Sequence, residues 1–171
     1  MKKGLLFLAV TAVIVLGSFR YIPDWVKYTS PEGKYTISFP GKPIESVEND
    51  TNTDKTIFQL HMAAYEVSDS EVYMSSYIDA HTFFPADKSL KQILEDSRDG
   101  AANSLNATNV VTTATNLGEN PFIEFLFTSA EFKGKDRIYV INKFQYSVLM
   151  IVSLNKDLTN ADKFITSFKH M

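Results

Sequence analysis

The longest hydrophobic pattern in the chain begins after Pro121 and ends near Ser153. Three segments of it are apolar on both faces and rich in β-branched and aromatic residues, namely 122–132, 137–141 and 146–152. Such segments are typical of strands that are buried on both sides. The polar breaks at 133–136 and 142–143 are short enough for hairpin turns. The pattern therefore predicts three consecutive antiparallel strands at the centre of a sheet that is covered on both faces.

Shorter periodic segments flank this centre. Alternating apolar residues predict further strands over 34–39, 56–65, 72–79 and 110–115. Apolar residues at helical spacing predict one helix from Ser89 to about Leu105 and a terminal helix from Thr159 to about Lys169. Ser89 and Gln92 have the spacing of a capping box, in which each side chain bonds to a backbone N–H of the other residue.

The N-terminus has the pattern of an export signal. Lys2 and Lys3 precede an uninterrupted apolar run over 4–17, and Arg20 ends the hydrophobic segment. Residues 1–20 are therefore predicted to be a signal peptide cleaved before Ser18, or else a retained membrane anchor. A buried core helix is the third alternative. The first two interpretations both place the remaining chain outside the cytoplasm.

The length and composition narrow the class of protein. After the N-terminal segment we expect a linker over 21–29 and a single domain over 30–171, because 171 residues suffice for one domain with its own core. The net charge of −3 argues against a nucleic-acid-binding protein, which would carry a basic surface. The chain has no cysteine, so disulfides, thiol catalysis and an acylated cysteine anchor are excluded.

The chain lacks the common local signatures of enzymes. It contains no phosphate-binding loop, no zinc-binding His-Glu-x-x-His helix and no Gly-x-Ser-x-Gly nucleophile turn. We therefore expect a protein that is not an enzyme and that needs no cofactor.

One acidic loop raises the question of a metal site. Asp50, Asn52 and Asp54 alternate like the first ligands of a calcium-binding EF-hand loop. Lys55 then stands where that loop needs glycine, and His61 stands where it needs a bidentate glutamate. A solvated loop is the favoured interpretation, and a cation site is the alternative.

An aromatic-rich stretch precedes the first predicted helix. It consists of Tyr73, Tyr77, His81, Phe83 and Phe84. These residues form either an apolar pocket or partner surface, or a part of the core beneath the helix. They are the candidate site for a partner or ligand.

The order and spacing of these segments resemble those of the bacterial PsbP-like proteins, whose fold is shared with a Ran-binding nuclear-import factor. The resemblance rests on residues 28–43, 72–79, 93–102, 116–121, 134–150 and 161–168. It implies an α+β fold in which helices cover both faces of an antiparallel β-sheet, an α/β/α sandwich. It also implies an exported accessory or binding protein.

Three functional hypotheses follow from the sequence, in order of preference. The first is a non-catalytic binding or accessory protein of the bacterial cell envelope, periplasmic or extracellular, which contacts the membrane only through its N-terminal segment. Its partner would be an unidentified envelope protein or a small ligand. The alternative is a carrier of a small molecule or a cation, and a hydrolase ranks third. A carrier should contain a sizeable cavity with few polar groups, whereas an accessory protein should have an exposed apolar patch.

Overall fold

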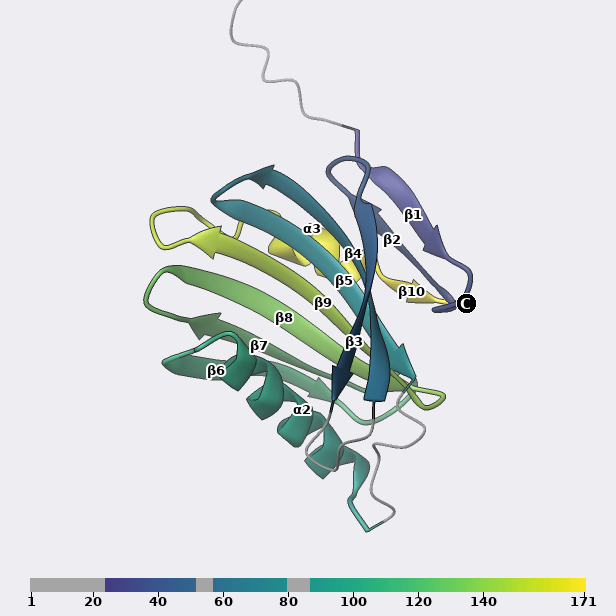
Figure 1. Ribbon diagram of the computed structural model, residues 1–171. Helices are drawn as coiled ribbons and strands as arrows, with labels where there is room; N and C mark the ends of the chain where they lie inside the picture. The colour runs from purple at the N-terminus through teal and green to yellow at the C-terminus, as the bar shows by residue number, and fades with distance from the viewer. Residues whose placement is uncertain (1–23, 52–56, 80–86) are drawn as a thin grey trace, which may run out of the picture.

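The computed structural model describes residues 24–51, 57–79 and 87–171. In this part of the chain, ten strands form two antiparallel sheets, and two helices pack against them (Figure 1). The strands are β1 (Val26–Ser30), β2 (Tyr35–Phe39), β3 (Ile44–Thr51), β4 (Ile57–Ser68), β5 (Glu71–Asp79), β6 (Asn109–Asn116), β7 (Phe122–Thr128), β8 (Phe132–Ile141), β9 (Phe144–Ser153) and β10 (Lys169–His170). The helices are α2 (Leu90–Ser104) and α3 (Ala161–Thr166).

The larger sheet has seven strands in the order β3-β4-β5-β9-β8-β7-β6. The three strands predicted at its centre are β7, β8 and β9, and the predicted hairpin before them is β4–β5. The turn between β8 and β9 lies at Asn142 and Lys143, as the sequence predicts. Both residues have positive φ values, 48° and 70°, which the tightest hairpin turns require.

Helix α2 covers one face of the β7–β9 part of this sheet. Ile123, Phe125 and Phe127 of β7 pack beneath it together with Ile138 of β8 and Leu94 of the helix. The predicted capping box is confirmed: the Gln92 N–H donates to Ser89 Oγ at 3.3 Å, and the Ser89 N–H donates to Gln92 Oε1 at 2.9 Å.

The opposite face carries the smaller sheet, in the order β1-β2-β10, together with α3. Tyr35, Ile37 and Phe39 alternate along β2 and point into this second core. They meet Tyr146 of β9 and Phe164 of α3, which are both fully buried. Aromatic rings of the two sheets meet there, since Tyr35 contacts Tyr77 of β5 and Tyr146 of β9.

The expectation of helices on both faces is therefore wrong. The described chain is mainly β, and the second face is covered by a three-stranded sheet and the six-residue helix α3. Alternation along β2 predicts a strand but cannot say to which sheet that strand belongs. Residues 26–29 of the expected linker belong to β1, which pairs with β2. The terminal helix is also shorter than predicted, because it ends at Thr166. The chain beyond it returns to pair with β2 as β10.

The turn predicted at 133–136 is also wrong, because β8 runs through this segment. The chain reverses earlier, at Ser129, whose N–H donates to the Phe132 carbonyl at 2.8 Å. Gly134 lies opposite Phe127 in the sheet. A Cβ on Gly134 would lie 2.4 Å from Phe127 Cζ and 2.7 Å from the Met150 carbonyl oxygen. The glycine marks a close approach within a strand and not a turn.

This close approach predicts opposite effects for two glycine-to-alanine substitutions. Gly134→Ala should lower the free energy of unfolding by roughly 1–3 kcal/mol, because the added methyl group overpacks the core. Gly100→Ala should raise it by about 0.5–1 kcal/mol, since Gly100 is helical and a Cβ there meets no atom within 4 Å. Urea unfolding of the two variants and the parent measures both effects. Equal stability of Gly134→Ala and the parent would contradict the packing described.

Candidate functional site

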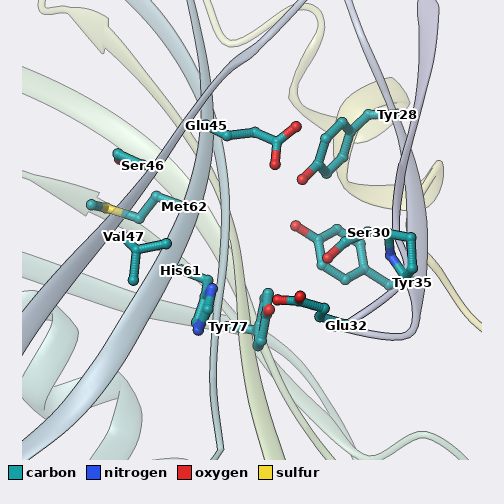
Figure 2. Close-up of a pocket in the computed structure, with 11 residues that line it drawn as sticks. Tyr28, Ser30, Glu32, Tyr35, Glu45, Ser46, Val47, His61, Met62 and Tyr77 are labelled. Carbon is teal, nitrogen blue, oxygen red and sulfur yellow. The ribbon is translucent and has the colours of Figure 1, made fainter.

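A pocket of about 330 Å³ opens between the β1–β2 hairpin and strands β3 to β5 (Figure 2). We call it the hairpin pocket. It is lined by Tyr28, Ser30, Pro31, Glu32, Tyr35, Glu45, Ser46, Val47, His61, Met62 and Tyr77.

The register of the sheet brings one wall of the hairpin pocket together. Val47 of β3 pairs with His61 of β4, and His61 pairs with Tyr77 of β5, so the three side chains lie on one face of the sheet. The His61 and Tyr77 rings stack, with their centroids 4.5 Å apart. Glu45 lies two residues before Val47 and therefore projects to the same face.

The β1–β2 turn forms the other wall. The Gly33 N–H donates to Ser30 Oγ at 3.1 Å. A Cβ on Gly33 would lie 2.7 Å from Tyr77 Cε1 and 2.8 Å from Tyr35 Cε1. The absence of a side chain at Gly33 therefore lets this turn rest directly on the two tyrosine rings.

The phenols of the hairpin pocket are kept neutral. Burial, assisted by the neighbouring Glu45 carboxylate, raises the pKa of Tyr28 to about 12. Burial and Glu32 also raise the pKa of Tyr77, and burial raises that of Tyr35. The carboxylates of Glu32 and Glu45 are then the acidic groups that give the pocket its negative charge.

The two carboxylates of the hairpin pocket have no basic partner in the described part of the chain. Within the described residues, no Lys or Arg forms an ion pair with Glu32 or Glu45, and none lines the pocket. No three His, Asp or Glu side chains of this described part lie close enough together to hold a metal ion. The arrangement offers negative charge, hydroxyl groups and aromatic rings to a ligand.

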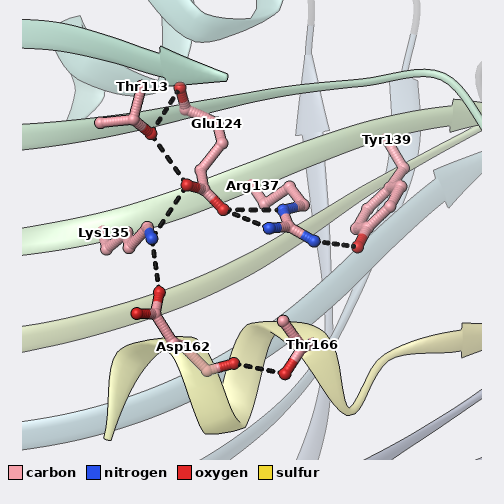
Figure 3. Close-up of polar contacts among 7 residues, drawn as sticks. All are labelled: Thr113, Glu124, Lys135, Arg137, Tyr139, Asp162 and Thr166. Carbon is pink, nitrogen blue, oxygen red and sulfur yellow. Dashed lines mark hydrogen bonds and ion pairs between the residues drawn. The ribbon is translucent and has the colours of Figure 1, made fainter. Parts of the chain in front are cut away.

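A second polar cluster joins four elements on the same face of the sheet (Figure 3). Glu124 of β7 is 5% exposed and accepts from Thr113 of β6 at 2.8 Å. Arg137 of β8 donates to Glu124 Oε2 through Nε at 2.8 Å and also through a second guanidinium nitrogen. Lys135 bridges Glu124 at 2.9 Å and Asp162 of α3 at 2.6 Å.

The charges of this cluster are matched internally. Burial alone would raise the pKa of Glu124, but hydrogen bonds from Lys135, Arg137 and Thr113 together lower it. The pKa of Lys135 is raised by its contacts with Asp162 and Glu124, which outweigh the effect of burial. Because both cations already have carboxylate partners, the cluster is best explained as the attachment of α3 to the sheet.

A third polar feature lies in the core beneath α2. Asp136 of β8 is 1% exposed and sits between Phe125 and Leu149 on the neighbouring strands. Its carboxylate accepts from the Ser147 hydroxyl at 2.9 Å. Burial outweighs this and the backbone hydrogen bonds, and raises the pKa of Asp136 from 3.8 to about 7.

Only some of the residues predicted from the sequence as a partner, ligand or metal site lie within the described part of the chain. His81, Phe83 and Phe84, together with Asn52 and Asp54, lie outside the described residues. Asp50 belongs to β3, where its backbone pairs with Phe58, and its side chain is not described.

The two candidate tyrosines of β5 have different surroundings. Tyr73 is fully buried, its ring packs against Trp25 and Phe164, and its hydroxyl donates to Glu71 at 2.6 Å. Tyr77 lines the hairpin pocket.

Most of the hairpin pocket was not predicted from the sequence. Tyr28, Glu32, Glu45 and His61 belong to a β-hairpin turn and to three different strands, so no local motif joins them. The alternation of β3 does place Glu45 and Val47 on one face, but it does not say what that face meets.

Comparison with known proteins supports the fold. The chain matches no protein-family model and no curated protein. Among solved structures it is similar to the solution structure of cyanobacterial PsbP (CyanoP) from Synechocystis sp. PCC 6803, with a TM-score of 0.53 and 10% sequence identity. The match covers 88% of this chain and 94% of that chain. The likeness to a PsbP-like fold is confirmed, although a small sheet and α3 stand in place of the expected layer of helices on the second face, and identity this low shows the fold alone.

The described residues include no helix with the length and apolar composition that crossing a membrane requires. The predicted export signal or anchor at 1–20 lies outside them.

The polar cluster around Lys135 predicts unequal effects for its two acidic partners. Glu124→Gln should lower the free energy of unfolding by about 3 kcal/mol, because it leaves Arg137 and Lys135 without a buried countercharge. Asp162→Asn removes a carboxylate from the same lysine, but the Asp162 side chain is 80% exposed. Asp162→Asn should therefore lower the free energy of unfolding by less than about 1 kcal/mol. Urea unfolding measures both values, and equal losses would contradict the assigned burial of Glu124.

Asp136 predicts a pH dependence of stability. Below about pH 4 its carboxyl is protonated in both the folded and the unfolded chain. Between about pH 4 and pH 7 the unfolded chain loses this proton while the folded chain keeps it, so the free energy of unfolding should fall as the pH rises. The total loss should be roughly 4 kcal/mol.

Asp136→Asn tests this dependence, because the amide stays neutral and can still accept the Ser147 hydrogen bond. The variant should be more stable than the parent at pH 8, and the difference should shrink at pH 5. Asp69→Asn, an exposed residue next to β4, should follow the parent at both pH values. Parallel profiles of Asp136→Asn and the parent would show that Asp136 titrates normally.

Proposed function

We propose that this protein is a non-catalytic binding protein, exported to the bacterial cell envelope, which acts as an accessory subunit to another envelope protein. The hairpin pocket and the adjoining outer edge of β3 form its binding surface. The observation that carries the proposal is the position of β3, which is at once a wall of the pocket and an outer strand of the sheet.

The exposed edge supports a protein partner. β3 pairs with β4 on one side only, and in the described chain no strand pairs with its other side. Ile44 and Val47 on β3 are 79% and 55% exposed, and Ile57 at the start of β4 is 71% exposed. Exposed apolar side chains on an unpaired edge strand are a common feature of surfaces that add a partner segment.

The chemistry of the pocket supports binding over catalysis. A general acid or base works best when its pKa lies near the working pH. The raised pKa values of Tyr28 and Tyr77 move both phenols away from this range. Each of these phenols instead interacts with its neighbours Ser30 and Glu45.

A carrier function is the second candidate. A volume of about 330 Å³ falls at the lower end of the range for small-molecule sites. The walls, however, contain two carboxylates and several hydroxyl groups instead of the few polar groups expected of a carrier cavity.

The proposed export of the protein rests on the pattern of residues 1–20.

Site-specific photocrosslinking in living cells tests the accessory function. A benzophenone amino acid at Ile44 should crosslink to a defined envelope protein, because this exposed position lies on β3, an outer strand of the sheet. The same amino acid at Val111 is the matched control. Val111 is 51% exposed and lies on β6, the outer strand at the opposite side of the sheet.

The expected result is a reproducible crosslinked product from Ile44 that is missing from Val111. The same products from both positions, or none from Ile44, would contradict an accessory function that uses the β3 edge.

A further inference from the structure

We propose that the hairpin pocket binds a positively charged alkylammonium group. This inference rests on the proposed function, since it names the chemistry that the proposed binding surface recognises. The group can belong to a small organic cation or to a lysine side chain of the partner protein.

The charge of the pocket selects a cation. The Glu32 and Glu45 carboxylates enter from opposite walls, one from the β1–β2 turn and the other from β3 (Figure 2). As described above, no basic side chain of the described residues pairs with either. A cationic ligand would supply the missing countercharge, whereas an anion would meet two like charges.

The aromatic walls select an organic cation. The Tyr28 and Tyr35 ring centroids are 6.1 Å apart, and so are those of Tyr35 and Tyr77, with the second pair nearly perpendicular. At neutral pH these rings are neutral phenols. A neutral tyrosine ring attracts an ammonium group through its π-electrons. Tyr28 is the partly exposed ring of the three and can make this contact, whereas Tyr35 and Tyr77 are 1% and 7% exposed and form the apolar floor of the pocket.

The spacing of the ligands argues against a metal ion. A hard cation such as Ca²⁺ needs six to eight oxygen ligands at about 2.3–2.6 Å. In the described part of the chain, Glu32, Glu45 and His61 do not come together as a group that could hold a metal. An alkylammonium ion is larger than a bare metal ion, and it does not need close coordination by several oxygen ligands.

Tetramethylammonium and its neutral analogue tert-butanol test the inference. Both are added to the ¹⁵N-labelled full-length protein at constant ionic strength, and the amide resonances of Tyr28, Ser30 and Val47 are followed. Tetramethylammonium should shift them to saturation, and tert-butanol, which has the same shape without the charge, should not. Equal shifts with both probes, or none with tetramethylammonium, would overturn the proposal.

Charge-removing variants show whether the two carboxylates are responsible. Glu32→Gln and Glu45→Gln should each weaken tetramethylammonium binding about threefold, and the double variant about tenfold. Both side chains are exposed, so the variants should fold like the parent. Glu66→Gln is the matched control, because it removes the same charge from an exposed position of β4 outside the pocket. Unchanged affinity in the double variant would overturn the proposal.

The source of the ammonium group is decided by competition. Excess butylammonium, which copies a lysine side chain, should abolish the Ile44 crosslink if the partner inserts a lysine, and should leave it intact if the ligand is a free cation. The proposed function and this inference can fail separately. A crosslink at Ile44 without ammonium binding would preserve the accessory function alone, and ammonium binding without a crosslink would favour the carrier.

Discussion

Aromatic packing between the two sheets is the interaction on which the rest of the structure depends. The ring of Tyr35 on β2 stacks on that of Phe168, with their centroids 5.3 Å apart, and lies 5.7 Å from the ring of Tyr146 on β9. Phe168 also stacks on Tyr139, with a centroid distance of 4.6 Å. The strands of the three-stranded sheet are only two to five residues long, and the sheet buries its apolar face against the large sheet. It persists because its inner side chains are buried in this aromatic layer. β1, β2, β10 and α3 therefore keep their places through contacts with the large sheet.

The hairpin pocket is a consequence of the same packing. The rings that hold the β1–β2 hairpin also form part of the pocket wall, since Tyr35 and Tyr77 belong both to the core and to the lining. The site is thus built on rigid strands, and only the turn around Gly33 comes from a loop. A site supported in this way is organised before its ligand arrives, which limits the entropy lost on binding.

The two faces of the large sheet differ in how a buried carboxylate is accommodated. On the face that carries α3, Glu124 is matched by Arg137 and Lys135, so its burial fastens a helix to the sheet. On the face beneath α2, Asp136 has hydroxyl and backbone donors but forms no ion pair with any described residue, and burial raises its pKa instead. Both outcomes follow from the rule that a buried carboxylate must be paired with a cation or be neutralised.

The sequence by itself determined the local elements, because periodicity and capping act over a few residues. The β4–β5 hairpin, the turn at Asn142 and Lys143, and helix α2 with its Ser89 cap were all predictable in this way. Gly134 shows the limit of local reasoning. The polar composition of residues 133–136 indicates a turn, but the Phe127 ring of the neighbouring strand makes glycine necessary at this position inside β8.

Only the tertiary structure decided which strands share a sheet and which side chains share the pocket. Tyr28, Glu45 and Tyr77 come from β1, β3 and β5, and their meeting depends on how the small sheet lies across the large one. That arrangement is set by the fit of aromatic rings far apart in the chain. Contacts of this kind leave no periodic pattern in the sequence, because each ring by itself predicts only that its position is buried.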